Sequence, residues 1–292
     1  MLFALLVLPL LASSANCAWH LVWSDEFNGN KLNDANWAYE TGGNGWGKYN
    51  VKIKPSTKFA KYNCFFYSGN NELEFYTAHR HENVRVEHGH LVIDARVENH
   101  QGKHFTSGRI HTKHAWTYGR FEASISCPSG HNLWPAFWMM PQGSKYGAWA
   151  ASGEIDIMEL RGDKPHEIMG TIHYGGTAPN NIYHGSGEKR YPQDFSTGFH
   201  HFAVEWAPHE IKWFVDGHHY HTENINRNMW SGKGHNPYHK NGEPFDQPFH
   251  IIFNLAVGGN FFGHGPYVTP EQAKHWRKHT MEVDYVRVFH WK

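Results

Sequence analysis

The sequence has no excess of one charge, few charged residues and almost no long apolar runs, and each of these features excludes a class of protein. Its 292 residues include 27 basic and 27 acidic side chains, without the basic excess of nucleic-acid-binding proteins. After the N-terminus, no stretch approaches the run of about 18 apolar residues that predicts a membrane-spanning helix. Aromatic residues nearly equal charged ones, at 16% and 18%, which excludes disorder. We therefore expect a folded protein without nucleic-acid or membrane partners.

The one long apolar run lies at the N-terminus. Leu2 to Ala12 has the length of a signal-peptide core and is too short to span a bilayer. Small residues follow it, and cleavage near Cys17 fits the small-residue rule. The sequence therefore predicts a signal peptide over residues 1–17 and a secreted, extracellular protein. A lipoprotein signal at Cys17 and a buried N-terminal strand are the alternative interpretations.

Cysteine is scarce, with three in the whole chain. Removal of the signal peptide would leave Cys64 and Cys127, which in an oxidising compartment are expected to form a disulfide. Two separate buried thiols are the alternative. The sequence also lacks an Asn-x-Ser/Thr sequon, so N-glycosylation is not expected.

Regular helical patterns are nearly absent, and only Pro270–Lys278 predicts a helix, of about two turns with proline at its start. Short runs rich in β-branched and aromatic residues dominate instead and predict an antiparallel sandwich or barrel. No linker or repeat is visible, so residues 18–292 are expected to form a single domain. Two long loops are predicted, over Gly42–Asn71 and Met229–Phe249. The predicted strands are His90–Val97, Arg120–Ser126, His201–Trp206, Glu210–Val215, Phe249–Val257 and Met281–Trp291.

The segment GEIDIMEL contains three acids, Glu154, Asp156 and Glu159. On a strand, Glu154 and Asp156 share one face, because side chains two residues apart point the same way. Strict alternation would send Glu159 to the apolar side, where a bare carboxylate is costly to bury. A β-bulge at Ile157 or Met158 would bring all three acids to one face.

Carboxyl groups crowded on one face raise the pKa of at least one of them. One acid then stays protonated while another stays ionised, which is the pair that glycoside hydrolysis requires. A solvated acidic strand face is the alternative interpretation.

The second notable segment is LWPAFWMMP, with Trp134 and Trp138 four residues apart. Indole rings stack on the apolar faces of sugar rings, although core packing would explain an isolated pair equally well. Asn71, Arg109 and His173 add polar groups of the kind that bond sugar hydroxyls.

Together these segments resemble glycoside hydrolase family 16, and the resemblance runs from about Trp19 to Trp291. Within the family, the WPAFW segment and the TIHYGG histidine look like the laminarinase-type β-1,3-glucanases. The resemblance is carried, in the family's order, by WSDEFNG, ENVRVEHGHLVIDAR, GRFEASISCPSGHNLWPAFWMMP, GEIDIMEL, EIKWFVDG, FNLAVGGNFFG and VDYVRV.

The resemblance implies a β-jelly-roll sandwich of two curved antiparallel sheets with a concave glycan-binding cleft. It implies a retaining endo-hydrolase of β-1,3-glucans such as laminarin, with mixed β-1,3/1,4-glucans as further candidate substrates. Glu154 would be the nucleophile, Glu159 the general acid/base, and Asp156 would tune Glu154. Retention implies that the two glutamate carboxyls lie about 5–5.5 Å apart.

The resemblance also implies sugar-binding and metal-binding residues. No cofactor is required for the chemistry, but a structural calcium would be held by Glu26, Gly89 and Asp284. We expect a monomer whose partner is the β-glucan polysaccharide. The sugar contacts implied are Trp46, Asn70, Asn71, Arg109, Trp134, Trp138 and His173.

One departure from the family pattern is an insertion of about twenty residues, Lys48–Gly69, which includes Cys64 and lies beside the expected cleft. Because of this insertion, the assignment of sugar-binding residues near Asn70 stays open. Two other functions also remain open. One is a non-catalytic β-1,3-glucan recognition protein on the same fold, although such relatives typically lose the catalytic glutamates. The other is a different family activity, on agar, carrageenan or xyloglucan.

Overall fold

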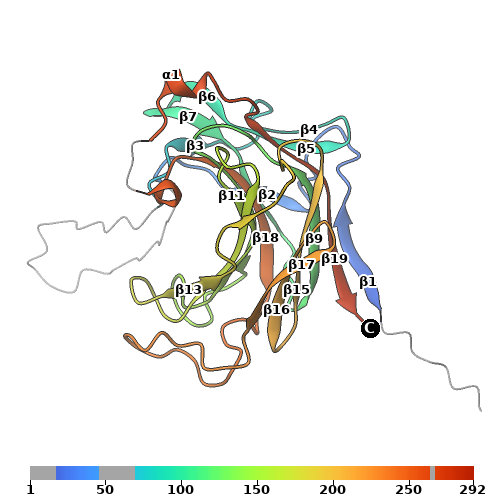
Figure 1. Ribbon diagram of the computed structural model, residues 1–292, viewed down its shortest axis with the longest axis vertical. Helices are drawn as coiled ribbons and strands as arrows, with labels where there is room; N and C mark the ends of the chain where they lie inside the picture. The colour runs from blue at the N-terminus through green and yellow to red at the C-terminus, as the bar shows by residue number, and fades with distance from the viewer. Residues whose placement is uncertain (1–17, 46–69, 264–266) are drawn as a thin grey trace, which may run out of the picture.

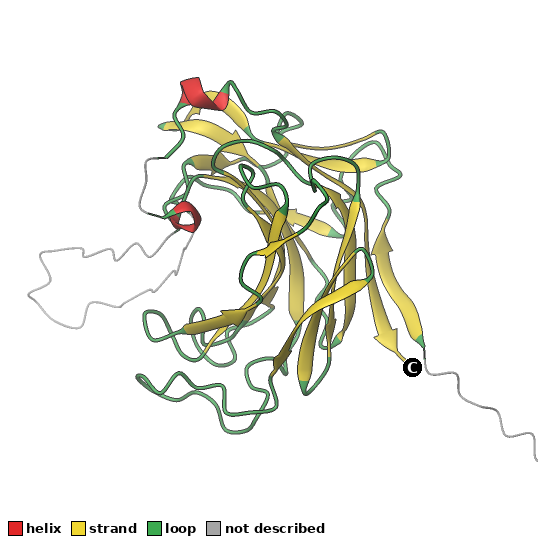
Figure 2. Cartoon of the chain, in the orientation of Figure 1, coloured by secondary structure: helices red, strands yellow, loops and turns green. Residues whose placement is uncertain are grey.

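The structure is a computed structural model that describes residues 18–45, 70–263 and 267–292. Two large antiparallel sheets lie against each other and form a sandwich, which confirms the predicted all-β fold (Figures 1 and 2). The expected signal peptide, Trp46 and Cys64 lie outside the described residues. Of the helices in the described ranges, none has the length and apolar character needed to cross a membrane.

The outer sheet has eight strands, and its last strand in the chain, β19, lies near its middle. β1 (Trp19–Asp25) pairs with β19 beside the main strand path. That path is β17 (His218–Asn224), β16 (Glu210–Val215), β15 (His200–Trp206), β9 (Gly119–Ser126), β19 (Thr280–Trp291), β5 (His90–Asp94) and β4 (Val84–Glu87).

The inner sheet also has eight strands and is strongly curved (Figure 1). β14 (Lys189–Arg190) pairs with β12 beside the main path. That path is β13 (Ile182–Gly185), β12 (Glu167–Tyr174), β11 (Glu154–Leu160), β10 (Leu133–Pro141), β18 (Phe249–Val257), β8 (Arg109–Thr112) and β2 (Trp37–Tyr39).

A smaller three-stranded sheet and two short helices complete the fold. The sheet contains β3 (Glu74–Tyr76), β7 (Lys103–Ser107) and β6 (Arg96–His100). The 3₁₀-helix η1 spans Asn260–Phe262, and the α-helix α1 spans Pro270–Ala273.

The core fills the space between the two large sheets. Phe121 and Val204 reach it from the outer sheet, and Phe137 and Phe253 from the inner one, all without solvent exposure. The rings of Phe137 and Phe253 stack with centroids 4.9 Å apart. Burying each such side chain contributes about 1.5–3 kcal/mol. Because alternate residues of the inner sheet point into this core, the residues between them are free to line its opposite, concave face.

The structure corrects two predicted elements. The predicted strand His90–Val97 is divided at Ala95, where the chain leaves the outer sheet for the third sheet. The predicted helix Pro270–Lys278 ends at Ala273. The indole N–H of Trp276 donates to the carbonyl of His131 at 2.8 Å, a contact that takes the chain out of the helical path. The predicted loop over Met229–Phe249 contains no strand or helix before β18 begins.

Cys127 lies in the core with 0% of its surface exposed, and as described it is a free thiol. Its predicted disulfide partner, Cys64, lies outside the described residues, so the pairing stays a prediction. Burial raises the pKa of the Cys127 thiol to about 12. A thiol so far from solvent and from its thiolate form is a poor partner for disulfide exchange, and its structural role is that of a small apolar side chain.

Candidate active site

The central feature of the inner sheet is a β-bulge in β11. Asp156 pairs with Thr171 of β12, whereas Glu159 pairs with Met169, so β11 has one extra residue between the two acids. The pairing with β10 shifts at the same place. Ile157 and Met158 are consecutive and both fully buried. The bulge predicted from sequence is therefore confirmed, and Glu159 is on the same face as Asp156.

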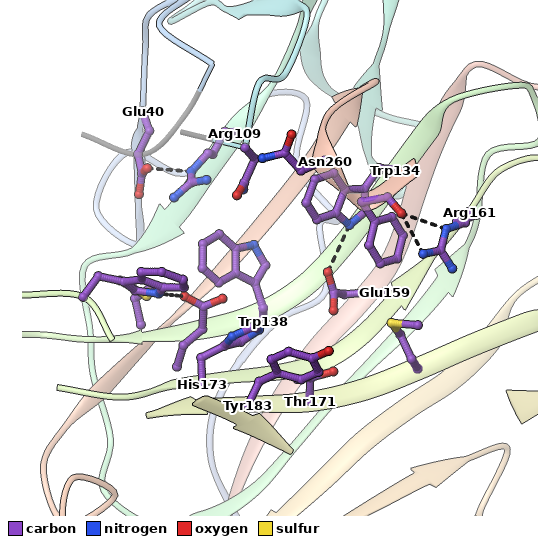
Figure 3. Close-up of a pocket in the computed structure, with 16 residues that line it drawn as sticks. Glu40, Arg109, Trp134, Trp138, Glu159, Arg161, Thr171, His173, Tyr183 and Asn260 are labelled. Carbon is purple, nitrogen blue, oxygen red and sulfur yellow. Dashed lines mark hydrogen bonds and ion pairs between the residues drawn. The ribbon is translucent and has the colours of Figure 1, made fainter. Parts of the chain in front are cut away.

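The acids lie at a cavity of about 560 Å³ on the concave face (Figure 3). Its walls come from β8, β10, β11, β12 and β13, and therefore from both sides of the acid-bearing strand. Its lining residues are Glu40, Asn70, Arg109, Trp134, Trp138, Met140, Trp149, Glu154, Glu159, Arg161, Met169, Thr171, His173, Tyr183, Asn260 and Phe261.

The three acids Glu154, Asp156 and Glu159 form a row along β11, and Glu154 and Asp156 lie at one end of it. The indole N–H of Trp149 donates to Glu154 Oε2 at 2.5 Å. Asp156 is buried below the cavity, and its Oδ2 lies 3.3 Å from Nε2 of His173. Burial, together with the adjacent charge of Glu154, raises the pKa of Asp156 well above its usual value. This shift favours the protonated form of Asp156 beside Glu154.

Glu159 lies at the other end of the row. Burial raises its pKa to about 8, and the neighbouring carboxyls of Asp156 and Glu154 add to this effect. The indole N–H of Trp134 donates to Glu159 Oε1 at 3.1 Å (Figure 3) and moderates the rise. At neutral pH, Glu159 is therefore a carboxylic acid that can give up a proton.

A second indole forms the cavity wall beside the acids. The indole N–H of Trp138 donates to Asn254 Oδ1 at 2.7 Å, and the Arg109 guanidinium lies 4.7 Å from its ring centroid. Arg109 Nε donates to Glu40 Oε2 at 2.6 Å. Burial alone would raise the pKa of Glu40, but Arg109 and His111 outweigh burial and hold it at about 2. Glu40 therefore stays ionised and orients Arg109.

A buried hydrogen-bond network supports this wall from below. Asn254 Nδ2 donates to the Tyr76 hydroxyl at 3.1 Å, and that hydroxyl donates to Glu72 Oε2 at 2.9 Å. Asn70, at the cavity surface, donates to Glu72 Oε1 at 3.1 Å. The network fixes Trp138 through Asn254 and fixes Asn70 directly, so both side chains are preorganised at the cavity.

Most of the sequence-predicted site residues are brought together here. Asp156 lies just beneath the cavity, whereas Asn71 is exposed at its rim, does not line it, and donates to Asn260 Oδ1 at 2.9 Å. Trp46 lies outside the described residues. The predicted residues that do line the cavity are Asn70, Arg109, Trp134, Trp138, Glu154, Glu159 and His173.

Several residues that line the cavity were not predicted from the sequence. Trp149 lies five residues before Glu154, so an aromatic residue close to the acid segment was an available signal. Phe261, in the GGNFFG segment, offered a weaker one. Glu40 and Tyr183 carried no local signal, since strand pairing brings them to the cavity. Arg161 lies two residues after Glu159, but its residue type alone did not point to the cavity.

Two of the calcium ligands implied by resemblance, Glu26 and Asp284, have other side chains beside their carboxylates. Both carboxylate oxygens of Glu26 accept hydrogen bonds from Arg287, at 2.9 and 2.7 Å, and these bonds lower the pKa of Glu26. Asp284 Oδ1 lies 3.7 Å from Nε2 of His90, beside the turn that contains Gly89. A calcium ion would have to displace the Arg287 guanidinium from Glu26.

Within the described ranges, one group of acids and histidines has the spacing to hold a metal ion. It consists of Glu154, Asp156 and His173, whose ligand atoms lie within 4.8 Å of one another. The raised pKa of Asp156 instead favours a proton shared between the two carboxyls.

Comparisons with known proteins agree with this geometry. A glucan endo-1,3-beta-glucosidase of Cryptopygus antarcticus is 46% identical, over 95% of this chain and 94% of its own. The laminarinase of Rhodothermus marinus, a solved structure, is 40% identical with a TM-score of 0.75, over 95% and 99% of the two chains. A non-specific endo-beta-1,3(4)-glucanase structure is 33% identical with a TM-score of 0.72, over 94% and 92%.

The family model described as glycosyl hydrolases family 16 matches residues 71–287, a span that includes the bulged strand and both walls of the cavity. The chain therefore belongs to glycoside hydrolase family 16.

Proposed function

We propose that this protein is a retaining endo-β-1,3-glucanase that hydrolyses internal bonds of β-glucans such as laminarin. One observation carries the proposal. The bulge of β11 presents Glu154 and Glu159 to the same aromatic-walled cavity, and the pKa of Glu159 is raised to about 8. The cavity therefore holds a proton donor and a second carboxyl that faces the same substrate.

In the proposed mechanism, Glu159 gives its proton to the glycosidic oxygen while Glu154 attacks the anomeric carbon. A covalent glycosyl–Glu154 intermediate forms and the leaving sugar departs with the proton. Glu159, now ionised, takes a proton from water, and this water displaces Glu154 from the anomeric carbon. The N–H of Trp149 at 2.5 Å orients Glu154, and Asp156, whose pKa is raised, lies beside it below the cavity.

The position of the acids within the cavity favours cleavage inside a polymer. Arg109 and Trp138 line the wall on one side of β11, and Thr171 and Tyr183 line it on the other. Sugar units therefore have binding surface on both sides of the acids, which an enzyme acting on internal bonds requires. The relatives named above include glucanases for 1,3-linked and 1,3(4)-linked glucans, so mixed-linkage glucans are further proposed substrates.

Product analysis on a substrate panel tests this function. Wild type should release oligosaccharides from laminarin with retained anomeric configuration, whereas Glu154→Gln, which keeps the size of the side chain, should release none. Barley glucan would reveal mixed-linkage activity, and agarose and xyloglucan test the other family activities. Laminarin binding by wild type without new reducing ends would instead support the recognition protein.

We also propose that residues 1–17 are a signal peptide and that the protein is secreted. The support is the apolar run from Leu2 to Ala12 followed by small residues. N-terminal sequencing of protein from the culture medium should begin near Ala18. Retention of the full chain inside the cell would contradict this proposal.

A further inference from the structure

A stack of side chains borders the cavity next to Glu159. The rings of Trp134 and Phe261 are nearly parallel, with an interplanar angle of 13° and centroids 4.5 Å apart. The guanidinium carbon of Arg161 lies 4.1 Å from the Phe261 ring centroid. Arg161 also donates two hydrogen bonds to the Phe261 carbonyl oxygen, from Nε at 3.1 Å and from Nη2 at 2.6 Å (Figure 3).

We propose that Arg161 and Phe261 are positioning residues for the proton-transfer step. They hold the Trp134 indole so that its N–H fixes the carboxyl of Glu159 against the glycosidic oxygen. This inference rests on the proposed function, because it assigns Glu159 the role of acid/base.

The carboxyl of Glu159 depends on this indole. Among the described residues, Trp134 is the one hydrogen-bond donor to the Glu159 side chain, at 3.1 Å. Trp134 itself is half-buried in an open cavity, so its neighbours must select its rotamer. A general acid works only within hydrogen-bond reach of the oxygen that it protonates, and displacements of about 1 Å can reduce rates strongly. A fixed indole therefore matters for the rate.

Arg161 connects two elements that the backbone does not connect directly. It follows β11 and lies two residues after Glu159, while Phe261 belongs to η1. Glu188 forms an ion pair with the same guanidinium and restrains it from the other direction. The guanidinium thus links the loop at η1 to the end of the acid-bearing strand. Lysine would keep the charge but lose the planar stacking and the paired hydrogen bonds.

A purely sugar-binding role for Phe261 is the competing interpretation, because its ring also lines the cavity. The two roles predict different kinetics. A lost sugar platform weakens binding and raises KM for every substrate. A misplaced acid slows formation of the glycosyl–enzyme, which kcat/KM reports, only when the leaving group needs a proton.

The test compares Arg161→Lys and Phe261→Leu on two substrates, laminarin and a 2,4-dinitrophenyl β-laminaribioside. Dinitrophenolate leaves as an anion, so forming the glycosyl–enzyme from it needs no acid. We expect kcat/KM to fall roughly 10–100-fold on laminarin and less than about 3-fold on the aryl glycoside, since general acid catalysis contributes about 100-fold or more.

Azide provides a second readout on the aryl glycoside. Azide attacks the anomeric carbon of the intermediate, forms a glycosyl azide and releases the Glu154 carboxylate, without needing a general base. It should raise kcat of the two variants more than that of wild type. Phe261→Tyr, which keeps the ring that stacks on Trp134, should lose less kcat/KM on laminarin than Phe261→Leu.

The matched control is Arg287→Lys. The Arg287 guanidinium also lies over an aromatic ring, 3.7 Å from the Tyr285 centroid, and also makes two hydrogen bonds, but it is on β19 of the outer sheet. Arg287→Lys should leave kcat/KM unchanged on both substrates. Equal losses on both substrates, a change in KM alone, or equal losses in the control would overturn the inference. If wild type cleaves neither substrate, the proposed function fails first.

Discussion

At the scale of single residues, Glu159 has the most altered environment of the acids that line the cavity. It is buried beside two other carboxyls, and its pKa is raised from 4.5 to about 8. A carboxyl in this state is an acid at neutral pH. The same burial lowers the stability of the folded chain once the proton is lost, so Glu159 should affect both rate and stability.

The effect on rate should be visible in the pH profile. As the pH rises through about 8, Glu159 loses its proton and kcat/KM for laminarin should fall tenfold per pH unit. The aryl glycoside with a dinitrophenolate leaving group should lack this basic limb. Steady-state kinetics between pH 5 and 10 measure both curves, and a basic limb shared by the two substrates would contradict the assignment.

The effect on stability has a defined sign. Between pH 4.5 and about 8, folded Glu159 keeps a proton that the unfolded chain releases, so wild-type stability falls as the pH rises through this window. Glu159→Gln removes this dependence. The variant should gain roughly 1–3 kcal/mol over wild type at pH 9, the cost typical of a poorly satisfied buried polar group. Denaturant unfolding at pH 4 and pH 9 measures it; the same difference at both pH values would refute the linkage.

At the scale of elements, the bulge of β11 places two consecutive apolar residues in the core. In a regular strand, one of Ile157 and Met158 would face the cavity and tolerate truncation. Here both are buried, so Ile157→Ala and Met158→Ala should each destabilise the fold by about 2–5 kcal/mol. Met140→Ala, on the half-buried cavity face of β10, is the control. A cost below about 0.5 kcal/mol at either position would contradict the bulge.

The elements also show what the sequence could predict. The common face of Glu154, Asp156 and Glu159 could be predicted because the two-residue periodicity of a strand is a local property. Glu159 breaks that periodicity, so a bulge had to be assumed. Phe261 carried only a weak signal and Tyr183 none, because the pairing of β10 with β18 and of β12 with β13 brings them to the cavity. Arg161 follows the acid-bearing strand directly, but its residue type alone did not point to a role. The predicted pairing of Cys64 with Cys127 rested on the count of cysteines, which contains no information about burial.

At the scale of the whole molecule, the two sheets meet directly beneath the acid-bearing strand. Trp213 of β16 is fully buried, and its indole N–H donates to the backbone carbonyl of Asp156 at 2.8 Å. Gly170 of β12 leaves room for this indole, since a Cβ there would lie 2.2 Å from Trp213 Cδ1. The Trp213 side chain therefore bonds the outer sheet directly to the active strand.

Gly170→Ala should disturb this contact. Overpacking of this kind costs about 1–3 kcal/mol, and each kcal/mol lowers the Tm of a domain of 150–250 residues by about 2–4 °C. Activity should also fall, because a displaced Trp213 releases the Asp156 carbonyl. Gly143→Ala, where a Cβ meets nothing within 4 Å, is the matched control for calorimetry and activity. An unchanged Tm in Gly170→Ala would contradict the close contact between β12 and the Trp213 indole.

The bond from Trp213 to Asp156 also has a consequence for heat inactivation. Because the active strand is held by the outer sheet as well as by its own neighbours, the acids should not lose their arrangement while the sandwich remains intact. Catalysis and near-ultraviolet circular dichroism should then disappear along one curve on heating, and cooling should restore both to the same extent.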